Sequence, residues 1–169
     1  MISQKMTDAI NEQIKNEFFS YWLYLSMSFA LDSMDLKVFS KWFHEQALEE
    51  QEHAMKMAKY LMDQGAPVKL KSLDQPETEF ESVEQIARMA LDHEKWVTEK
   101  INELATLARS ENDFATENFM QWFVQEQVEE VATASELLAL TKMATDPGQM
   151  LVVEDRIMAL REHGGESGE

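Results

Sequence analysis

Four long segments of this chain carry apolar residues at steps of three and four, and each apolar stripe is interrupted near its middle by a glutamate. This step is the period of an α-helix that buries one face. Only 5 glycines and 3 prolines occur in 169 residues, so the chain has few of the turn signals that a β fold needs. The sequence therefore predicts an all-α fold, a four-helix bundle that forms one domain over residues 1–162.

Capping and stop signals set the expected helix boundaries. Three residues have the short polar side chains that cap helix N-termini: Asp35, Ser82 and Asp113. Gly65 is a good C-terminal stop, and the Asp146-Pro147 pair is typical of the start of a short fifth helix. Residues 163–169 are expected to form a disordered tail. The expected helices cover residues 7–31, 35–64, 82–109, 113–144 and 146–162.

The connection over residues 66–81 contains two prolines and no amphipathic period, so we expect it to be extended. About 16 extended residues reach roughly 50 Å, whereas a helix of about 28 residues is about 42 Å long. This crossover can therefore span the whole bundle and make the second and third helices parallel. The short turns make the first and second helices, and the third and fourth, antiparallel neighbours.

The interrupting glutamates all lie within about one turn of their helix midpoints: Glu17, Glu50, Glu94 and Glu130. Midpoints stay level whichever way a helix runs, so the four carboxylates should meet in one layer. A single glutamate on an apolar face is usually explained by snorkelling or by an ion pair, but no lysine or arginine occupies the stripes at this level. Carboxylates gathered in a core repel one another and lose hydration, so they must take up protons or bind cations. We interpret the layer as a metal site.

The residue types around this layer narrow the choice of metal. His53 follows Glu50 by three positions, which places both side chains on one helix face. Carboxylate oxygens with one imidazole suit iron or manganese. The chain has no cysteine, so a thiolate zinc site is excluded.

The formal net charge of −17 argues against nucleic acid or an anionic membrane as a partner. From charge alone, a solvated acidic surface and a cation-binding role both remain open. No segment approaches the roughly 20 apolar residues of a membrane span, and the first residues lack the apolar core of a secretory signal. We therefore expect a cytoplasmic protein.

Several motifs resemble those of the ferritins, specifically the non-haem bacterial ferritins; they lie at residues 11–13, 49–53, 93–94, 100–104 and 121–127. Ferritin-like dimetal bundles combine one glutamate from each of two helices with E-x-x-H from each of the other two. Here Glu17 and Glu94 are the single glutamates, and Glu50 with His53 forms one E-x-x-H pair. The fourth helix departs from the scheme, because it carries a Q-x-x-E pair, Gln127 and Glu130.

The resemblance implies a ferroxidase centre for two irons. Glu17, Glu50 and His53 look like the ligands of the first iron, and Glu50 would bridge to a second. The second iron would be held by Glu94 and Glu130, with Gln127 close by. Tyr24 and Trp122 resemble aromatic residues that ferritins place beside the centre, although ordinary core packing explains their spacing equally well.

Three further acidic residues match a third iron site of bacterial ferritins: Glu49, Glu126 and Glu129. They would share Glu130 with the centre, and a solvated acidic flank is the alternative interpretation. Gln51 stands where bacterioferritins place a haem-binding methionine, so no haem is expected. Glu117 corresponds roughly to a position that lines an iron access channel in ferritins.

The resemblance as a whole implies an iron-storage protein with ferroxidase activity, which oxidises Fe(II) with O2. The ferric mineral would be stored inside a hollow cage, usually of 24 identical subunits. Two other classes stay open from the residues themselves. One is a dimetal oxidoreductase that keeps its metals and stores nothing, and the other is a purely structural acidic bundle.

Overall fold

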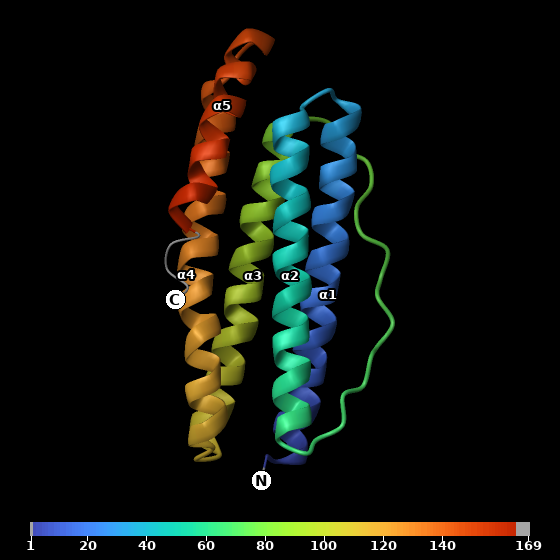
Figure 1. Cartoon of the computed structure of the whole chain (residues 1–169), viewed down its shortest axis with the longest axis vertical. Coiled ribbons are helices and arrows are strands. Elements are labelled where there is room, and N and C mark those ends of the chain that lie inside the picture. The colour runs from blue at the N-terminus through green and yellow to red at the C-terminus, as the bar shows by residue number, and fades with distance from the viewer. Residues whose placement is uncertain (1, 165–169) are drawn as a thin grey trace.

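The computed structural model describes residues 2–164, with side chains through residue 157. Within this range it contains five α-helices: α1 (Gln4–Ser33), α2 (Lys37–Asp63), α3 (Val83–Ser110), α4 (Phe114–Met143) and α5 (Pro147–Gly164). Figure 1 shows α1 to α4 lying side by side along one long axis, with α5 folded back beside α4. The prediction of an all-α four-helix bundle with a short fifth helix is confirmed. Residues 165–169 of the expected tail lie outside the described residues.

The crossover between α2 and α3 has the predicted extended conformation. It runs the length of the bundle on its outside, so that α2 and α3 point in the same direction (Figure 1). Asn11 of α1 holds its first part in place, donating to the Pro67 carbonyl at 3.0 Å and accepting from the Lys69 amide at 2.6 Å. Packing is closest within the pairs α1–α2 and α3–α4, and α1 also packs against α3.

Three helices of the bundle are followed by a residue with left-handed backbone: Asp35 (φ 61°), Gly65 (φ 71°) and Asn112 (φ 56°). After each of them the next amide bonds back across the helix end, as from Leu36 N to Leu31 O at 3.0 Å. Gly65 is thus the predicted stop. The prediction that Asp35 caps the N-terminus of α2 is wrong, because Asp35 belongs to the end of α1. Aspartate tolerates the left-handed region better than most residues, and this explains its position.

The other N-terminal caps are side-chain oxygens from the preceding residue. Ser82 accepts from the Gln85 amide at 3.1 Å, and Asp113 accepts from the Thr116 amide at 3.0 Å, as predicted. Ser3 caps α1 in the same way, and the helix therefore begins before the expected residue 7.

The N-terminus of α2 is capped from a distant part of the chain. Its N-cap residue, Leu36, makes no side-chain cap bond. Instead the buried Glu154 of α5 accepts from the amides of Val38 at 3.0 Å and Phe39 at 3.3 Å. A carboxylate at this position satisfies free amides and also interacts favourably with the helix dipole. This contact ties α5 to the bundle.

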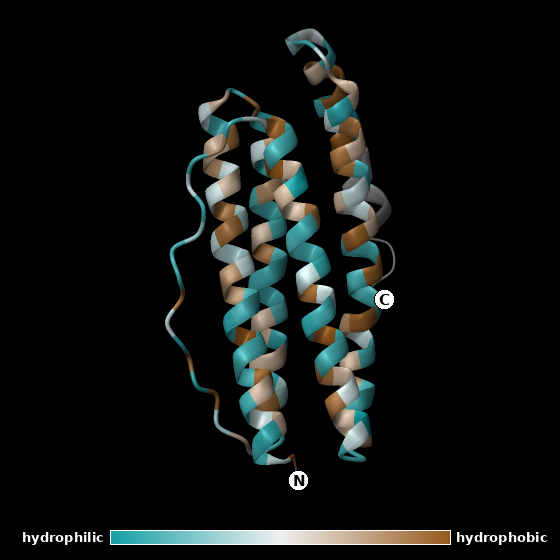
Figure 2. Cartoon of the chain, turned by 180° about the vertical axis from the view of Figure 1, so that it is seen from behind, coloured by the Kyte–Doolittle hydropathy of each residue, from teal (hydrophilic) through white to brown (hydrophobic). Residues whose placement is uncertain are grey.

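The core consists of two apolar clusters, one toward each end of the bundle. One includes Tyr24, Phe43 and Leu137, and the other includes Ile14 and Ile101. Figure 2 shows hydrophilic residues interleaved with hydrophobic ones along the helices. Among the described helices, none has both the length and the apolar character of a membrane span. The residues between the two clusters are polar, and they form the site described next.

Candidate metal centre

Carboxylates from all four bundle helices converge between the two apolar clusters. Glu17 of α1, Glu50 of α2 and Glu94 of α3 are each at most 2% exposed, and Glu130 of α4 is partly buried. Electrostatic repulsion links Glu17 with Glu50, Glu50 with Glu94, and Glu130 with both Glu50 and Glu94. The midpoint positions of these residues thus bring them into one layer.

His53 lies beside this layer, one turn along α2 from Glu50. Its Nδ1 atom is 3.4 Å from Glu50 Oε2 and 3.9 Å from Glu17 Oε2. Potential ligand atoms of these three residues all lie within 4.8 Å of one another. His53 also belongs to a second such group, with Glu126 and Glu130. The imidazole therefore stands between two places where a cation could be held.

The buried carboxylates differ in how many of their oxygens have hydrogen-bond partners. Glu17 Oε1 accepts from Gln13 at 2.8 Å, while Glu17 Oε2 has no partner among the described residues. Glu94 Oε1 accepts from the Tyr24 hydroxyl, while Glu94 Oε2 has none. Neither oxygen of Glu50 has a hydrogen-bond partner within the part of the chain that the structure describes. Unpartnered buried oxygens are costly, and a bound cation would satisfy them. One free oxygen suits a ligand of one ion, and two suit a ligand shared by two ions.

Burial and mutual repulsion raise the pKa values of all four carboxyl groups. Burial first, and the charge of Glu50 second, raise the pKa of Glu17 to about 8. Burial likewise raises the pKa of Glu94 to about 7, although the hydrogen bond from Tyr24 opposes the shift. The pKa values of Glu50 and Glu130 are raised well above 4.5, again mainly by burial and then by the charge of Glu94. Without metal, the site therefore holds protons near neutral pH.

Neutral side chains orient the carboxylates from behind. Asn16 donates to Gln13 at 3.0 Å, and Gln13 in turn donates to Glu17. Gln46 donates to Glu130 Oε2 at 2.8 Å. Such second-layer donors fix the direction of a ligand without taking part in binding. Neither Gln13 nor Gln46 was predicted from the sequence in this role. Gln46 lies one turn before Glu50 on the same buried stripe, and this position is the sequence signal that indicates its role.

Gln127 faces the layer but uses its oxygen elsewhere. The Thr98 hydroxyl donates to Gln127 Oε1 at 2.9 Å, and a hydrogen bond from Gln127 helps to lower the pKa of Glu94. An amide that accepts through oxygen presents its NH2 group to the carboxylate. A ligand role for Gln127 stays a prediction.

The predicted third site falls in a pocket of about 240 Å³ between α2 and α4. Its lining residues are Glu49, Glu52, His53, Lys56, Trp122, Glu126 and Glu130. Three of the residues assigned to the third site, Glu49, Glu126 and Glu130, thus line one pocket. Glu129 is exposed and does not line the pocket, whereas Glu52, which was not predicted, does.

The remaining predicted residues lie around the centre or away from it. Trp122 contacts the His53 ring edge-on, with centroids 5.5 Å apart. His93, which is not a predicted ligand, bonds to Ser20 at 2.7 Å. Glu117 pairs with Arg109 at 2.8 Å, so its assignment to an access channel stays a prediction.

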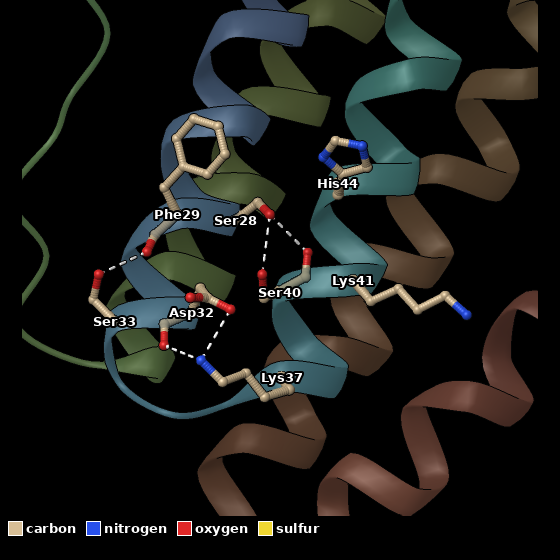
Figure 3. Close-up of a pocket in the computed structure, with 8 residues that line it drawn as sticks. All are labelled: Ser28, Phe29, Asp32, Ser33, Lys37, Ser40, Lys41 and His44. Carbon is tan, nitrogen blue, oxygen red and sulfur yellow. Dashed lines mark hydrogen bonds and ion pairs between the residues drawn. The ribbon is translucent and has the colours of Figure 1, made fainter.

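A larger pocket of about 610 Å³ lies where the C-terminal end of α1 meets the N-terminal end of α2 (Figure 3). It contains one carboxylate, Asp32, which pairs with Lys37 at 3.0 Å. Lys41 and His44 add further nitrogen groups to its lining. This set of side chains is unsuited to a cation, so the carboxylate layer is the better candidate for a metal.

The fold and the site together define a class. A four-helix bundle with inward glutamates on every helix and a Glu-x-x-His pair is the arrangement of the ferritin-like dimetal proteins.

Comparison with known proteins gives the same class and narrows it. Residues 7–144 match the ferritin-like domain family. Ferritin BfrB of Mycolicibacterium smegmatis is 38% identical over 143 residues, which cover 85% of this chain and 79% of that protein. A bacterial non-heme ferritin of Bacteroides fragilis is 38% identical over 148 residues, covering 88% of this chain and 93% of the relative. The crystal structure of an open-pore ferritin from the archaeon Archaeoglobus fulgidus superposes with a TM-score of 0.91 at 40% identity, over 93% of this chain and 98% of the other. This chain belongs to the ferritin family, and these matches place it with the ferritins of bacterial type.

Proposed function

We propose that this protein stores iron and that its carboxylate layer is a ferroxidase centre, which oxidises Fe(II) with O2. The observation that carries the proposal is the state of Glu50. This buried carboxylate has two oxygens without a partner among the described residues, and it repels both Glu17 and Glu94. It is therefore suited to contact two iron ions at once.

In this proposal the two ferrous ions are substrates with different surroundings. Glu17 and His53 would bind the first ion, and Glu94 and Glu130 the second, with Glu50 between them. The unpartnered oxygens of Glu17 and Glu94 support this division. Because the second position has no histidine, its ion would be held by oxygen alone.

The chemistry follows from the ligand type. Each ferrous ion gives up one electron, so a pair can reduce dioxygen by two electrons. Hard anionic oxygens favour ferric over ferrous iron, and this drives the oxidation. Iron binding would also displace protons from Glu17 and Glu94, whose pKa values are raised to about 8 and about 7. The ferric product would then leave through the acidic pocket, where Glu49, Glu126, Glu130 and the nearby Glu129 would form the third iron site.

We further propose that residues 1–162 form one domain and that the chain assembles with itself, in a cage of about 24 copies if it follows the usual ferritin plan. Several large apolar side chains are exposed on the single chain, including Trp22, Phe29 and Leu70. Exposed apolar groups of this size are usually covered by a partner. A cytoplasmic location and the absence of haem also remain part of this proposal.

Stopped-flow oxidation of Fe(II) in air tests the centre. Glu50→Ala or His53→Ala should slow the initial rate at least about 100-fold, because each removes a ligand. Glu99→Ala and His44→Ala are matched controls, since both residues are exposed on α3 and α2 and should leave the rate unchanged. Unchanged rates in both ligand variants would contradict the proposed centre.

The two rival classes give different results in the same sample. A dimetal oxidoreductase that stores nothing would stop at about two irons per chain and elute as a small oligomer. A structural acidic bundle would bind no Fe(II) under anaerobic conditions and would show no new absorbance in air. Storage predicts continued uptake by a large particle.

A further inference from the structure

One lysine lies inside the acidic pocket between α2 and α4. The Lys56 ammonium lies 3.0 Å from the centroid of the Trp122 ring and 5.9 Å from that of Phe123. Among the described residues that line this pocket, Lys56 is the single lysine or arginine, and four of the others are glutamates. A positive group here partly neutralises the pocket.

The pocket is more than a cluster of acidic residues, because it adjoins the metal centre. The buried His53 lines it, and His53 also contacts Glu17 and Glu50 in the layer. Ligand atoms of His53, Glu126 and Glu130 lie within 4.8 Å of one another. An ion that moves from the centre toward this side therefore comes close to the Lys56 ammonium.

The ammonium is held in a way that allows it to move. Its contact with the face of Trp122 is a cation–π interaction, which is weak at partly exposed sites. Lys56 itself is exposed, and its four-carbon chain can swing outward. Burial lowers the pKa of Lys56, whereas the charge of Glu126 raises it, so the ammonium interacts with the same carboxylate that a metal ion would use.

We propose that Lys56 is a resident counter-ion that a metal ion must displace in order to occupy this pocket. This role rests on the proposed ferroxidase function, and it makes the pocket a place of transit. While an ion is bound, the lysine competes for the same carboxylates, so the ion leaves more easily. Lys56 would thereby set how long iron stays after oxidation.

Terbium(III) is a suitable probe, because it prefers oxygen ligands, undergoes no redox reaction here and emits when a nearby tryptophan is excited. Emission that is lost in Trp122→Phe reports the pocket. We expect Lys56→Gln to raise terbium affinity in this pocket about tenfold, since one positive charge within several ångströms is removed. Lys56→Arg keeps the charge and should stay within about twofold of the unmodified protein.

Lys59→Gln is the matched control, because Lys59 lies on the same helix and pairs with Asp63 at 2.8 Å on the exposed side. It removes the same charge from outside the pocket and should change the affinity less than about twofold. Equal effects of Lys56→Gln and Lys59→Gln would overturn the proposal, because Lys56 would then act only through the overall charge.

Iron kinetics provide a second readout. After a first addition of Fe(II), two per chain, a second addition should react at least about threefold more slowly in Lys56→Gln than in the unmodified protein. A second addition as fast as in the unmodified protein would contradict the transit role. Failure of the unmodified protein to oxidise iron would instead count against the proposed function, and the terbium titration would still decide whether Lys56 controls the pocket.

Discussion

At the scale of single residues, the centre depends on which carboxylate oxygens are already occupied. Tyr24 and Gln13 each donate to one oxygen of a glutamate and leave its other oxygen without a partner, whereas both oxygens of Glu50 lack a partner among the described side chains. The spacing of these residues along the sequence predicted that they lie on buried helix faces. It could not give the hydrogen bond from Tyr24 to Glu94, because these two residues are 70 positions apart along the chain.

Removing the Tyr24 hydroxyl should weaken the second metal position. In Tyr24→Phe, Glu94 loses a donor that stabilises its charged form, so its pKa should rise further above about 7. Anaerobic titration with Zn(II) at pH 6.5 should show affinity at this position reduced about tenfold. Tyr21→Phe is the control, because Tyr21 is only partly buried and contacts Trp22 instead. Equal affinities in the two variants would remove Tyr24 from the centre.

The stability of the metal-free protein should fall as the pH rises. Glu17 and Glu94 have folded-state pKa values of about 8 and about 7, above their ordinary value of 4.5. Below pH 4.5 both groups are protonated whether the chain is folded or unfolded, and their stabilising contribution is fully present. Between pH 4.5 and 8 the unfolded chain releases protons that the folded chain retains, so this contribution is lost.

Urea unfolding of the metal-free protein between pH 5 and pH 8 measures this effect. Glu17→Gln carries no titrating group at this position, and its free energy of unfolding should depend less on pH. Saturating Zn(II) should reverse the trend, because metal binding requires the deprotonated carboxylates. The assigned pKa shifts would be contradicted by a free energy of unfolding that rises with pH, by the same amount in the metal-free unmodified protein and in metal-free Glu17→Gln.

The proposed third site shows what residue spacing along one helix leaves open. Glu126 and Glu129 are three positions apart on one helix, and the spacing alone does not say which of them faces α2. The structure places Glu126 in the pocket and leaves Glu129 exposed. Glu52 and Lys56 line the same pocket. The sequence does not predict this, because many charged residues lie on this side of α2 and their spacing does not distinguish pocket-lining residues from solvent-exposed ones.

At the scale of helices, the periodicity of apolar residues predicted the elements, and capping and stop signals predicted most of their ends. The error at Asp35 has a physical cause: aspartate favours both the N-cap and the left-handed position that follows a helix. A three-residue turn places both positions close together. The cap from Glu154 could not be predicted, because it comes from 116 residues away.

Asp35→Gly should stabilise the protein by about 0.5–1 kcal/mol, because glycine adopts a φ of 61° without strain. The substitution removes only an exposed ion pair with Lys37 at 3.7 Å, and such pairs contribute little. Asp35→Ala keeps the strain and should be no more stable than the unmodified chain. Thermal unfolding of the three proteins distinguishes these outcomes, and a gain with alanine equal to that with glycine would contradict the backbone explanation.

Glu154→Ala should destabilise the fold by about 1–2 kcal/mol, because two amides at the N-terminus of α2 lose their acceptor. Glu154→Gln keeps an acceptor oxygen and should lose less. Asp155→Ala is the neighbouring control, since Asp155 is exposed. Urea unfolding monitored by circular dichroism measures all three, and a loss no larger for Glu154→Ala than for Asp155→Ala would show that the cap adds nothing.

At the scale of the whole molecule, the arrangement of the four helices determines where the charges meet. Antiparallel pairs joined by one long crossover keep all four helix midpoints level, whatever the direction of each helix (Figure 1). This is why the bundle and its carboxylate layer could be predicted from the sequence. The path of α5 could not, because it depends on packing against α2 and α4.

Crystals grown without oxygen in the presence of Fe(II), measured at the iron absorption edge, test the central claim most directly. Two anomalous peaks per chain are expected inside the bundle: one among Glu17, Glu50 and His53, and one among Glu50, Glu94 and Glu130. Both peaks should disappear in Glu50→Ala. Iron found only on the surface, or one interior ion that does not contact Glu50, would contradict a shared dimetal centre.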